Sequence, residues 1–367
     1  MTVEPFAAVV DQFKPQGKVI SIRPYGKGNV NDTFLVTLVC RNDKNFILQR
    51  INTRIFQQPE LVMQNIRTFS EYVRSQQEHI SLSPGRRWEV PRVLLTKNGS
   101  DHWIGPDGSF WRAISFIEQA QSFETIQNIG HAQEVGYALA MFHLLIKDLP
   151  IEALADTLEG FHVTPRYLRH YDEVLAKTGP SKSPEVDYAR QFINRQRTLV
   201  DVLEKAKEQG KLHLRPIHGD PKVNNVLIDI TTRQAVSLID LDTVKPGLIH
   251  YDIGDCLRSC CNPLGEDTEQ WERVRFELDF CRAILKGYLS IVGGFLTETD
   301  YEYLFDAIRL IAFELGLRFF TDYLERDIYF KVGHKEQNLT RAMVQFKLTE
   351  SIESQAADIR AVIRELK

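Results

Sequence analysis

A short polar run at residues 218–225 constrains this chain more than any other feature of its sequence. It reads His-Gly-Asp-Pro-Lys-Val-Asn-Asn and brings a carboxylate (Asp220), a cation (Lys222) and an amide (Asn225) into one segment. An apolar, β-branched strand follows and ends at a second carboxylate, Asp240. Phosphoryl transfer needs such a set. One carboxylate accepts the proton of the attacking hydroxyl, a cation offsets phosphate charge, and an amide with another carboxylate holds Mg²⁺.

The spacing of this run is similar to the catalytic loop of kinase-like phosphotransferases, which reads H-R-D-x-K-x-x-N in protein kinases. Gly219 stands where protein kinases have arginine, which indicates the small-molecule branch that includes aminoglycoside and choline kinases. Asp220 is therefore our candidate base, since a carboxylate in reach of a substrate hydroxyl can orient it and take its proton. Lys222 is the candidate cation beside the transferred phosphoryl group.

Asn225 and Asp240 are the candidate metal ligands, because Mg²⁺ takes oxygen ligands at short range and keeps several waters. Asp242 competes for this role, and we prefer Asp240 because it ends the strand directly. H-x-D alone is a weak signal, and Asp-x-Asp after a strand also occurs in metal hydrolases and ordinary turns. The full set of residue types, with an apolar strand between them, is much harder to obtain by chance. The sequence therefore favours a kinase-type site.

The composition is that of an ordinary globular protein. The chain has 367 residues, 43% hydrophobic and 26% charged, so it can bury a large core in more than one lobe. A net charge of −4 gives no electrostatic footprint for nucleic acid or membranes. Five cysteines without a C-x-x-C pair, and no signal-peptide pattern, predict reduced thiols in a cytoplasmic protein. No apolar run approaches the ~20 residues needed to cross a bilayer.

The order of predicted elements indicates an α+β, protein-kinase-like fold with two lobes. The first part reads as three strands, a helix and two strands, at residues 19–23, 33–39, 45–50, 59–76, 90–96 and 110–117. Later residues have helical spacing, with helices predicted at 130–145, 185–208, 268–292, 300–324 and 338–366. We predict a small β-rich nucleotide-binding lobe at 1–118 and a large, mostly helical catalytic and substrate-binding lobe at 119–367.

Candidate nucleotide contacts lie in the predicted N-terminal lobe. A loop between its first two strands carries Gly26, Gly28 and Asn29, and backbone N–H groups there can cover nucleotide phosphates. Only G-x-G is present, so a plain hairpin is the default interpretation, and the position upstream of the polar run strengthens the weak signal for a nucleotide loop. Glu118 closes the segment predicted as the hinge between the lobes and is a further candidate contact.

The third predicted strand lacks the lysine that grips the α- and β-phosphates in protein kinases. Gln49 and Arg50 stand there, and strand alternation puts them on opposite faces, so only one can point into the cleft. Gln49 follows the apolar run where the lysine usually sits, whereas Arg50 has the right charge. The choice stays open at this point. The missing lysine also favours a non-catalytic, pseudokinase-like binding protein, against which the complete polar set argues.

An arginine lies in an otherwise apolar helical stretch. Arg318 is surrounded in the sequence by Leu and Phe residues, and a guanidinium in such a place needs a partner. Substrate contact is one explanation, and an ion pair with Glu314 one helical turn earlier is another. Tyr329 follows beyond the end of this stretch and is a second candidate substrate contact.

The chain resembles the N-acetylhexosamine 1-kinases, a branch of the aminoglycoside phosphotransferase-like fold. The likeness runs nearly end to end and is carried by residues 24–31, 47–56, 161–165, 218–225, 239–243 and 318–330. Gln49 occurs in that branch as well, so the missing lysine is tolerated there. The chain departs from the family at Asn29, where the family has His, and at Gly219, where it has Asn.

The resemblance implies an activity in which ATP and Mg²⁺ phosphorylate the anomeric hydroxyl of N-acetylglucosamine or N-acetylgalactosamine. It implies that Asp220 is the base and that Asn225 and Asp240 hold the metal. Arg318 and Tyr329 match positions that look like sugar contacts. The expected partners are thus a nucleotide and an amino sugar. Kinases of choline, aminoglycosides or other metabolites share the fold and remain the main alternative.

Overall fold

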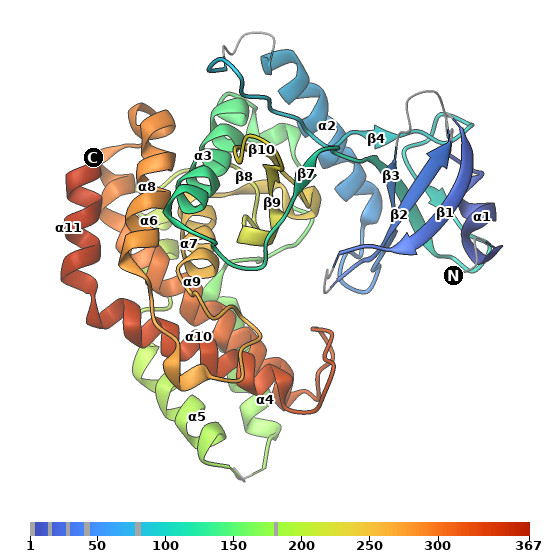
Figure 1. The fold of residues 1–367 in the computed structure, drawn as a ribbon. Coiled ribbons are helices and arrows are strands. Elements are labelled where there is room, and N and C mark those ends of the chain that lie inside the picture. The colour runs from blue at the N-terminus through green and yellow to red at the C-terminus, as the bar shows by residue number, and fades with distance from the viewer. Residues whose placement is uncertain (1–3, 14–16, 27–29, 40–44, 78–81, 180–182) are drawn as a thin grey trace.

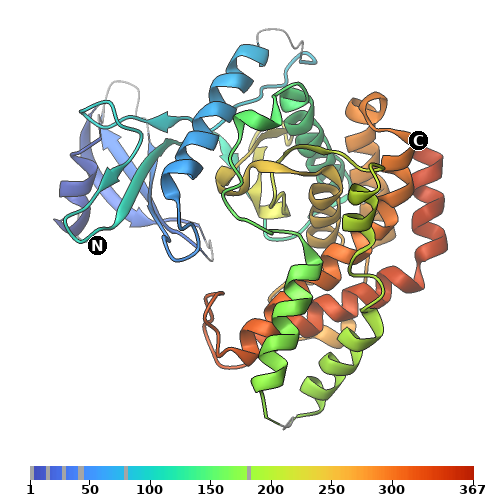
Figure 2. The same cartoon turned by 180° about the vertical axis from the view of Figure 1, so that it is seen from behind.

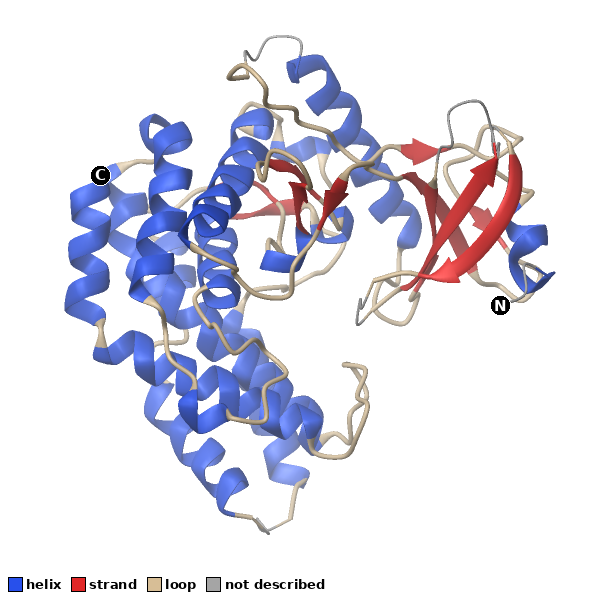
Figure 3. Cartoon of the chain, in the orientation of Figure 1, coloured by secondary structure: helices blue, strands red, loops and turns tan. Residues whose placement is uncertain are grey.

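The structure is a computed structural model that describes residues 4–13, 17–26, 30–39, 45–77, 82–179 and 183–367. A smaller region built on a sheet and a larger helical region lie side by side (Figure 1). Figure 3 shows most strands gathered in the first region and most helices in the second. The predicted α+β architecture, with a small sheet-based N-terminal part, is confirmed. The exact boundary at residue 118 stays a prediction.

The N-terminal sheet forms from β-branched, aromatic and apolar runs, which favour a pleated, half-buried surface. Its strands are β1 (Lys18–Pro24), β2 (Asp32–Val39), β3 (Phe46–Ile51), β4 (Val93–Leu94), β5 (Trp103–Ile104) and β6 (Phe110–Ser115). All pairs are antiparallel in the order β1-β2-β3-β6-β4, and β5 pairs with β6. Val36, Leu48 and Ala113 are fully buried and share a core with helix α1 (Glu4–Val10). This sheet forms one wall of the site.

Helix α2 (Pro59–Gln77) lies between the sheet and the helical region (Figure 2). Its apolar side packs on the larger region, where Phe69 stacks on Phe142 of α3 (Ile129–Ile146) with ring centroids 5.1 Å apart. The buried Asn65 donates hydrogen bonds of 2.8 and 2.9 Å to two backbone carbonyls of that region. The helix therefore ties the sheet to the helical core.

The larger region contains the remaining helices. They are α4 (Thr164–Lys177), α5 (Pro184–Gln196), α6 (Val202–Glu208), α7 (Ile249–Cys260), α8 (Leu278–Val292), α9 (Glu298–Leu324), α10 (Gln337–Ser354) and α11 (Ala356–Leu366). Helices α3 and α8 approach closely at Gly136 and Gly287, where any side chain would collide with the backbone of the other helix. The long α9 packs against α7 and α10, and its Phe313, Leu317 and Phe320 are fully buried.

Short strands of the larger region flank the polar run of residues 218–225. They form two antiparallel sheets, β10-β9-β7 and β11-β8, from β7 (Ala120–Gln121), β8 (Leu214–Ile217), β9 (Val226–Asp229), β10 (Ala235–Leu238) and β11 (Lys245–Leu248). Residues 218–225 connect β8 to β9. Leu238 pairs with Val226, so Asn225 and Asp240 lie at the same end of this strand pair.

The helix predicted at 300–324 is confirmed as α9, and the one at 130–145 as α3. The single helix predicted at 185–208 is wrong, because the structure has two helices there, α5 and α6. The chain turns between them and buries both Leu199 and Val200, which one continuous helix would place on different faces. Helix α4 was absent from the prediction.

Two further predicted helices are shorter in the structure. The one predicted at 268–292 begins only at Leu278, and the Phe276 backbone N–H before it donates to Ser351 Oγ of α10 at 2.9 Å. The one predicted at 338–366 breaks at Gln355, whose side-chain amide donates to the Phe276 carbonyl at 2.9 Å. Contacts between distant segments therefore set both helix ends.

The described cysteines are free and buried, as the composition predicted. They are Cys256, Cys260, Cys261 and Cys281. Within the described ranges, no helix is long and apolar enough to span a bilayer.

Candidate active site

A buried carboxylate anchors the loop of residues 218–225. Asp252 of α7 accepts the backbone N–H groups of His218 and Gly219, each at 2.7 Å. His143 of α3 contacts the same carboxylate at 2.9 Å. Burial alone would raise the pKa of Asp252, but these hydrogen bonds and the neighbouring imidazoles lower it, so the group stays ionised. The backbone just before Asp220 is thus fixed.

Gly219, next to this anchor, has a left-handed backbone conformation that favours glycine. Its φ is +86°, a conformation that costs L-residues roughly 1–2 kcal/mol. A Cβ at this position would also lie 2.7 Å from the backbone oxygen of Thr243. The Thr243 hydroxyl in turn donates to the His218 carbonyl at 2.8 Å. Glycine at this position is therefore explained by the close approach of the turn that follows Asp240.

The structure brings three of the predicted site residues together. Lys222 Nζ donates to Asp220 Oδ2 at 2.7 Å, and Asn225 Nδ2 donates to the Asp220 carbonyl at 2.8 Å. Burial lowers the pKa of Lys222, but the charges of Asp220 and Asp240 outweigh that effect and raise it. Lys222 is therefore a cation beside the predicted base. No described group donates to the side-chain oxygen of Asn225, which leaves it free for a metal ion.

Asp240 presents an unpaired carboxylate to the cleft. Its side chain is exposed, and within the described residues it makes no hydrogen bond or ion pair. Its φ is +67°, a left-handed conformation that aspartate tolerates better than most residues. The protein around the carboxylate and the charges of Asp242 and Asp220 raise its pKa, and the charges of Lys222 and Arg112 oppose this shift. A bound cation would therefore stabilise the ionised form of this carboxylate.

These donors fit a divalent metal that arrives with its substrate. The described residues contain no cluster of three or more His, Cys, Asp and Glu side chains suited to a metal. Asp240 and Asn225 supply one carboxylate and one amide oxygen at the same end of a strand pair. Mg²⁺ is typically held by one or two carboxylates together with substrate phosphates and water. The residues present fit that mode of binding, and a resident metal held by protein alone does not fit them.

Asp242, the rival metal ligand, is already engaged. It is buried, and its Oδ1 lies 2.5 Å from Arg112 Nη2 of strand β6. Its Oδ2 accepts a 2.6 Å hydrogen bond from Asn31 Nδ2. Both partners come from the N-terminal region. The geometry therefore favours Asp240 for the metal and gives Asp242 a different task, which is to join the two regions.

The two candidates on the third strand point in different directions, and a nucleotide contact of either stays a prediction. Gln49 faces the cleft, where its Oε1 accepts from Arg112 Nε at 2.9 Å and its Nε2 donates to Thr33 Oγ1 at 3.0 Å. Arg50 faces the other way and pairs with Asp32 at 2.5 Å on the exposed side. The inward cation is thus Arg112, which the sequence reasoning missed. Its only sequence signal was a single arginine inside the apolar strand at 110–115.

The remaining predicted nucleotide contacts are placed in part. Gly26 has a φ of +73° with no atom near the position of a Cβ, which suits a tight loop. Gly28 and Asn29 lie outside the described residues. Glu118 accepts a 3.0 Å hydrogen bond from Asn45 Nδ2, and its carbonyl accepts one from Arg87 at 2.8 Å. Protein groups therefore occupy Glu118, and its contact with a nucleotide stays a prediction.

Arg318 is surrounded by aromatic rings. Its guanidinium carbon lies 5.0 to 5.6 Å from the ring centroids of Phe161, Tyr167, Tyr329 and Phe330. It forms no ion pair or hydrogen bond with any described residue. Burial lowers its pKa, but the nearby Tyr167, Tyr329, Glu314 and Asp220 raise it, so the charge is retained. The predicted pair of Arg318 and Tyr329 is thus brought together, within electrostatic range of Asp220.

The alternative ion pair of Arg318 with Glu314 is absent, because Glu314 has other partners. Its carboxylate accepts from Thr164 Oγ1 at 2.6 Å and contacts His162 Nδ1 at 2.9 Å. His162 Nε2 lies 2.7 Å from the carbonyl oxygen of Gly219. Burial lowers the pKa of His162, but the charge and hydrogen bond of Glu314 outweigh it and raise the value. A protonated His162 thus links α9 to the loop that carries Asp220, a role that sequence reasoning missed.

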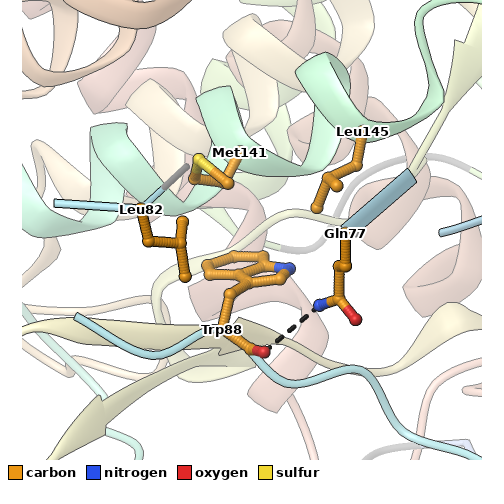
Figure 4. Close-up of a pocket in the computed structure, with 5 residues that line it drawn as sticks. All are labelled: Gln77, Leu82, Trp88, Met141 and Leu145. Atoms are coloured by element: carbon orange, nitrogen blue, oxygen red, sulfur yellow. Dashed lines mark hydrogen bonds between the residues drawn. The ribbon is translucent and has the colours of Figure 1, made fainter. Parts of the chain in front are cut away.

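A separate cavity of about 170 Å³ lies between the end of α2 and helix α3 (Figure 4). Its lining is mostly apolar and consists of Gln77, Leu82, Trp88, Met141 and Leu145. Gln77 Nε2 donates to the Trp88 carbonyl at 3.2 Å, whereas the indole Nε1 is buried without a partner among the described residues. It contains none of the residues of the polar cluster and is no part of the site.

The sheet-based region, the helical region and the polar cluster between them define a kinase-like phosphotransferase. The sequence pattern of the phosphotransferase enzyme family matches residues 21–288, which is most of the chain. The chain belongs to this family, and it is a small-molecule kinase.

Similar solved structures confirm the predicted two-lobed kinase-like fold. An aminoglycoside phosphotransferase from Alicyclobacillus acidocaldarius has a TM-score of 0.64 at 15% identity, over 100% of this chain and 98% of its own. A microcompartment-associated aminopropanol kinase has a TM-score of 0.61 at 16% identity, over 98% and 99%. A choline kinase from Cryptosporidium parvum has a TM-score of 0.58 at 13% identity, over 93% and 91%. At sequence identities this low, the similarity shows that the fold is shared and does not show a shared acceptor.

Proposed function

We propose that this protein transfers the γ-phosphoryl group of ATP, with Mg²⁺, to the anomeric hydroxyl of an N-acetylhexosamine. The observation that carries the choice of acceptor is Arg318. Its charge has no anionic partner among the described residues and lies within electrostatic range of Asp220. A guanidinium offers five N–H donors and repels cations. It therefore favours a neutral acceptor rich in hydroxyl and carbonyl oxygens, which describes an acetamido sugar.

In this proposal the chain's own residues position the acceptor and move its proton. The acceptor oxygen forms a bond to the γ-phosphorus while the bond from that phosphorus to the β-phosphate oxygen breaks, and ADP leaves. Asp220 takes the proton of the attacking hydroxyl, and Lys222 offsets charge on the phosphoryl group. Asn225 and Asp240 would hold Mg²⁺, which neutralises phosphate charge when bound. Arg318 and Tyr329 would orient the sugar.

A kinase of an amine acceptor is the second candidate. Its support is the fold shared with solved aminopropanol and choline kinases. Proteins bind quaternary ammonium groups in cages of aromatic rings, and such rings are present near the site. In this chain, however, Arg318 fills the space among them, and its charge would repel a cationic acceptor. The electrostatics therefore favour the sugar.

An acceptor screen with a blocked sugar tests the proposal. Purified protein with ATP and Mg²⁺ is offered N-acetylglucosamine, N-acetylgalactosamine, their methyl glycosides, choline, ethanolamine and an aminoglycoside, and ADP release is followed. We expect turnover with the free sugars only, because the methyl glycosides lack the anomeric hydroxyl. Asp220→Asn should lower kcat by roughly 10²–10⁴-fold. Turnover with an amine and none with either sugar would reject the sugar and retain the kinase.

A further inference from the structure

Arg112 is a charged side chain sealed between the two regions. It projects from β6 and is 1% exposed. Its Nη2 lies 2.5 Å from Asp242 Oδ1, in the turn just after Asp240, and its Nε donates to Gln49 Oε1 at 2.9 Å. Strands β3 and β6 place Gln49 and Arg112 opposite each other as Cα partners. The guanidinium therefore lies between the third strand and the turn that carries Asp240.

One nitrogen of this buried cation has no partner. Nη1 of Arg112 is buried without a hydrogen-bond acceptor among the described residues. Buried polar atoms nearly always have a partner, and an orphaned donor on a charged group is costly. Asp242 Oδ1 also lacks a hydrogen-bond partner, although it lies 2.5 Å from Nη2, so this ion pair is not in hydrogen-bonding geometry. Nη1 is therefore available to an acceptor from a ligand, next to the residue proposed to hold Mg²⁺.

The usual source of charge at this place is missing. Protein kinases pair a lysine of the third strand with a glutamate of the following helix. Here the third strand offers Gln49, and the acidic residues of α2, Glu60 and Glu71, are exposed. The buried polar residue of that helix is Asn65, which binds backbone carbonyls. Among the described residues next to Gln49, Arg112 is the cation that has a carboxylate partner, and that partner is Asp242.

We propose that Arg112 binds the phosphates of the nucleotide through Nη1, while Asp242 and Gln49 hold its guanidinium in place. This rests on the proposed function, because it requires a nucleoside di- or triphosphate in the cleft. Protein kinases have this cation on the third strand and its anionic partner on the following helix. Here the cation is on the neighbouring strand β6, and its partner is in the turn after Asp240. Arg112 thus supplies the grip on the phosphates that the missing lysine would otherwise give.

Binding measurements test this without relying on turnover. Calorimetry with Mg–ADP and with adenosine is run on the wild type and on Arg112→Met. A charge-assisted hydrogen bond to phosphate predicts ~10–100-fold weaker ADP binding, with adenosine binding unchanged. Arg112→Met leaves Asp242 unpaired, so the double variant Arg112→Met/Asp242→Asn serves where the single variant fails to fold. Arg50→Met is the matched control, since this neighbour faces away from the cleft, and it should bind ADP like the wild type.

A charge transplant gives the sharpest result. Because Gln49 and Arg112 are register partners, adding Gln49→Lys to the double variant should restore most of the lost ADP affinity. ADP binding that is equal in the wild type and the double variant would overturn the inference and leave the proposed function standing. A parallel loss for ADP and adenosine would also overturn it, because it would make Arg112 a support between the regions. A wild type that binds neither ADP nor ATP would reject the proposed function as well.

Discussion

Asp220 has one carboxylate oxygen engaged and one available. Its Oδ2 receives Lys222 Nζ at 2.7 Å and lies 3.4 Å from Asn225 Nδ2, whereas no described residue donates to Oδ1. A free oxygen beside a fixed cation suits a group that must accept a proton from a substrate hydroxyl. The position of that oxygen depends on the backbone before it, which turns through the left-handed conformation of Gly219.

Gly219→Ala should therefore affect both stability and rate. The positive φ costs roughly 1–2 kcal/mol for an L-residue, and the clash with the Thr243 oxygen adds to it. We expect a loss above that range in urea unfolding, together with a fall in kcat. Gly210→Ala is the control, because Gly210 also has a positive φ of +68° but open space around it. Equal losses for the two variants would show that the contact with Thr243 has no energetic weight.

The sequence predicted the residues of the site that are close together in the chain. Asp220, Lys222 and Asn225 lie in one loop, so their spacing alone indicates shared chemistry. Arg112 and Asp242 could not be paired in the same way, because they are far apart in the chain and meet only when β6 faces the turn after β10. Long-range pairs of this kind are set by tertiary packing, which single-sequence patterns do not contain.

At the scale of elements, helix α9 joins the aromatic cluster around Arg318 to the loop of residues 218–225. It carries Arg318 toward the aromatic rings and, one turn earlier, Glu314 toward His162. His162 contacts the Gly219 carbonyl, so a shift of α9 would be passed to the loop that holds Asp220. The sequence predicted this helix from its long apolar pattern. It failed where tertiary contacts end a helix, as at Gln355.

Arg318→Ala should weaken binding of the acceptor far more than binding of the nucleotide. Loss of a charged hydrogen-bond donor predicts a rise in the acceptor KM of ~10–100-fold, with the KM for ATP nearly unchanged. Steady-state kinetics at saturating co-substrate measure both values. Arg309→Ala, on the same helix, removes an arginine that pairs with Asp306 and should change neither KM. A similar rise of both KM values would argue against a sugar contact for Arg318.

The link between His162 and Glu314 predicts a pH dependence of stability. The pKa of His162 is raised in the folded protein above its usual value of about 6.5. The contribution of His162 to the free energy of unfolding is therefore fully present below pH 6.5. It is lost as the pH rises through the raised pKa. Urea unfolding from pH 6 to pH 9 should show this loss, and His162→Gln should flatten it. His213→Gln, at an exposed histidine, should leave the profile unchanged, and a wild-type profile without the decline would contradict a protonated His162.

At the scale of the molecule, the two regions touch through buried and exposed polar contacts, in addition to the ion pairs of Arg86 with Glu134 and Arg87 with Asp229. The buried set is Asp242 with Arg112 and Asn31. On the exposed side, Lys331 of the loop between α9 and α10 lies 3.2 Å from Asp32 of β2. The order of elements along the chain predicted the two lobes. It did not predict this contact, because residue 331 lies in a loop whose position only the packed molecule defines.

The exposed contact should contribute little. Exposed ion pairs are typically worth ~0.2–1 kcal/mol, and salt weakens them. Lys331→Ala should therefore change the free energy of unfolding by less than ~1 kcal/mol, with the difference vanishing at 1 M salt. Urea unfolding at low and high salt measures this. A larger, salt-independent loss would show that the loop makes other contacts on which stability depends.

The aromatic surroundings of Arg318 also bear on how acceptor preference can change during evolution. Aromatic rings surround the guanidinium of Arg318, and other proteins use aromatic rings to bind a foreign ammonium group. The chain supplies the cation itself, so the cage is filled before any acceptor arrives. Exchanging this one residue for a small neutral one would empty the cage and remove the repulsion together. If the proposed function holds, exchanging this one residue should shift the acceptor preference from neutral sugars toward amines.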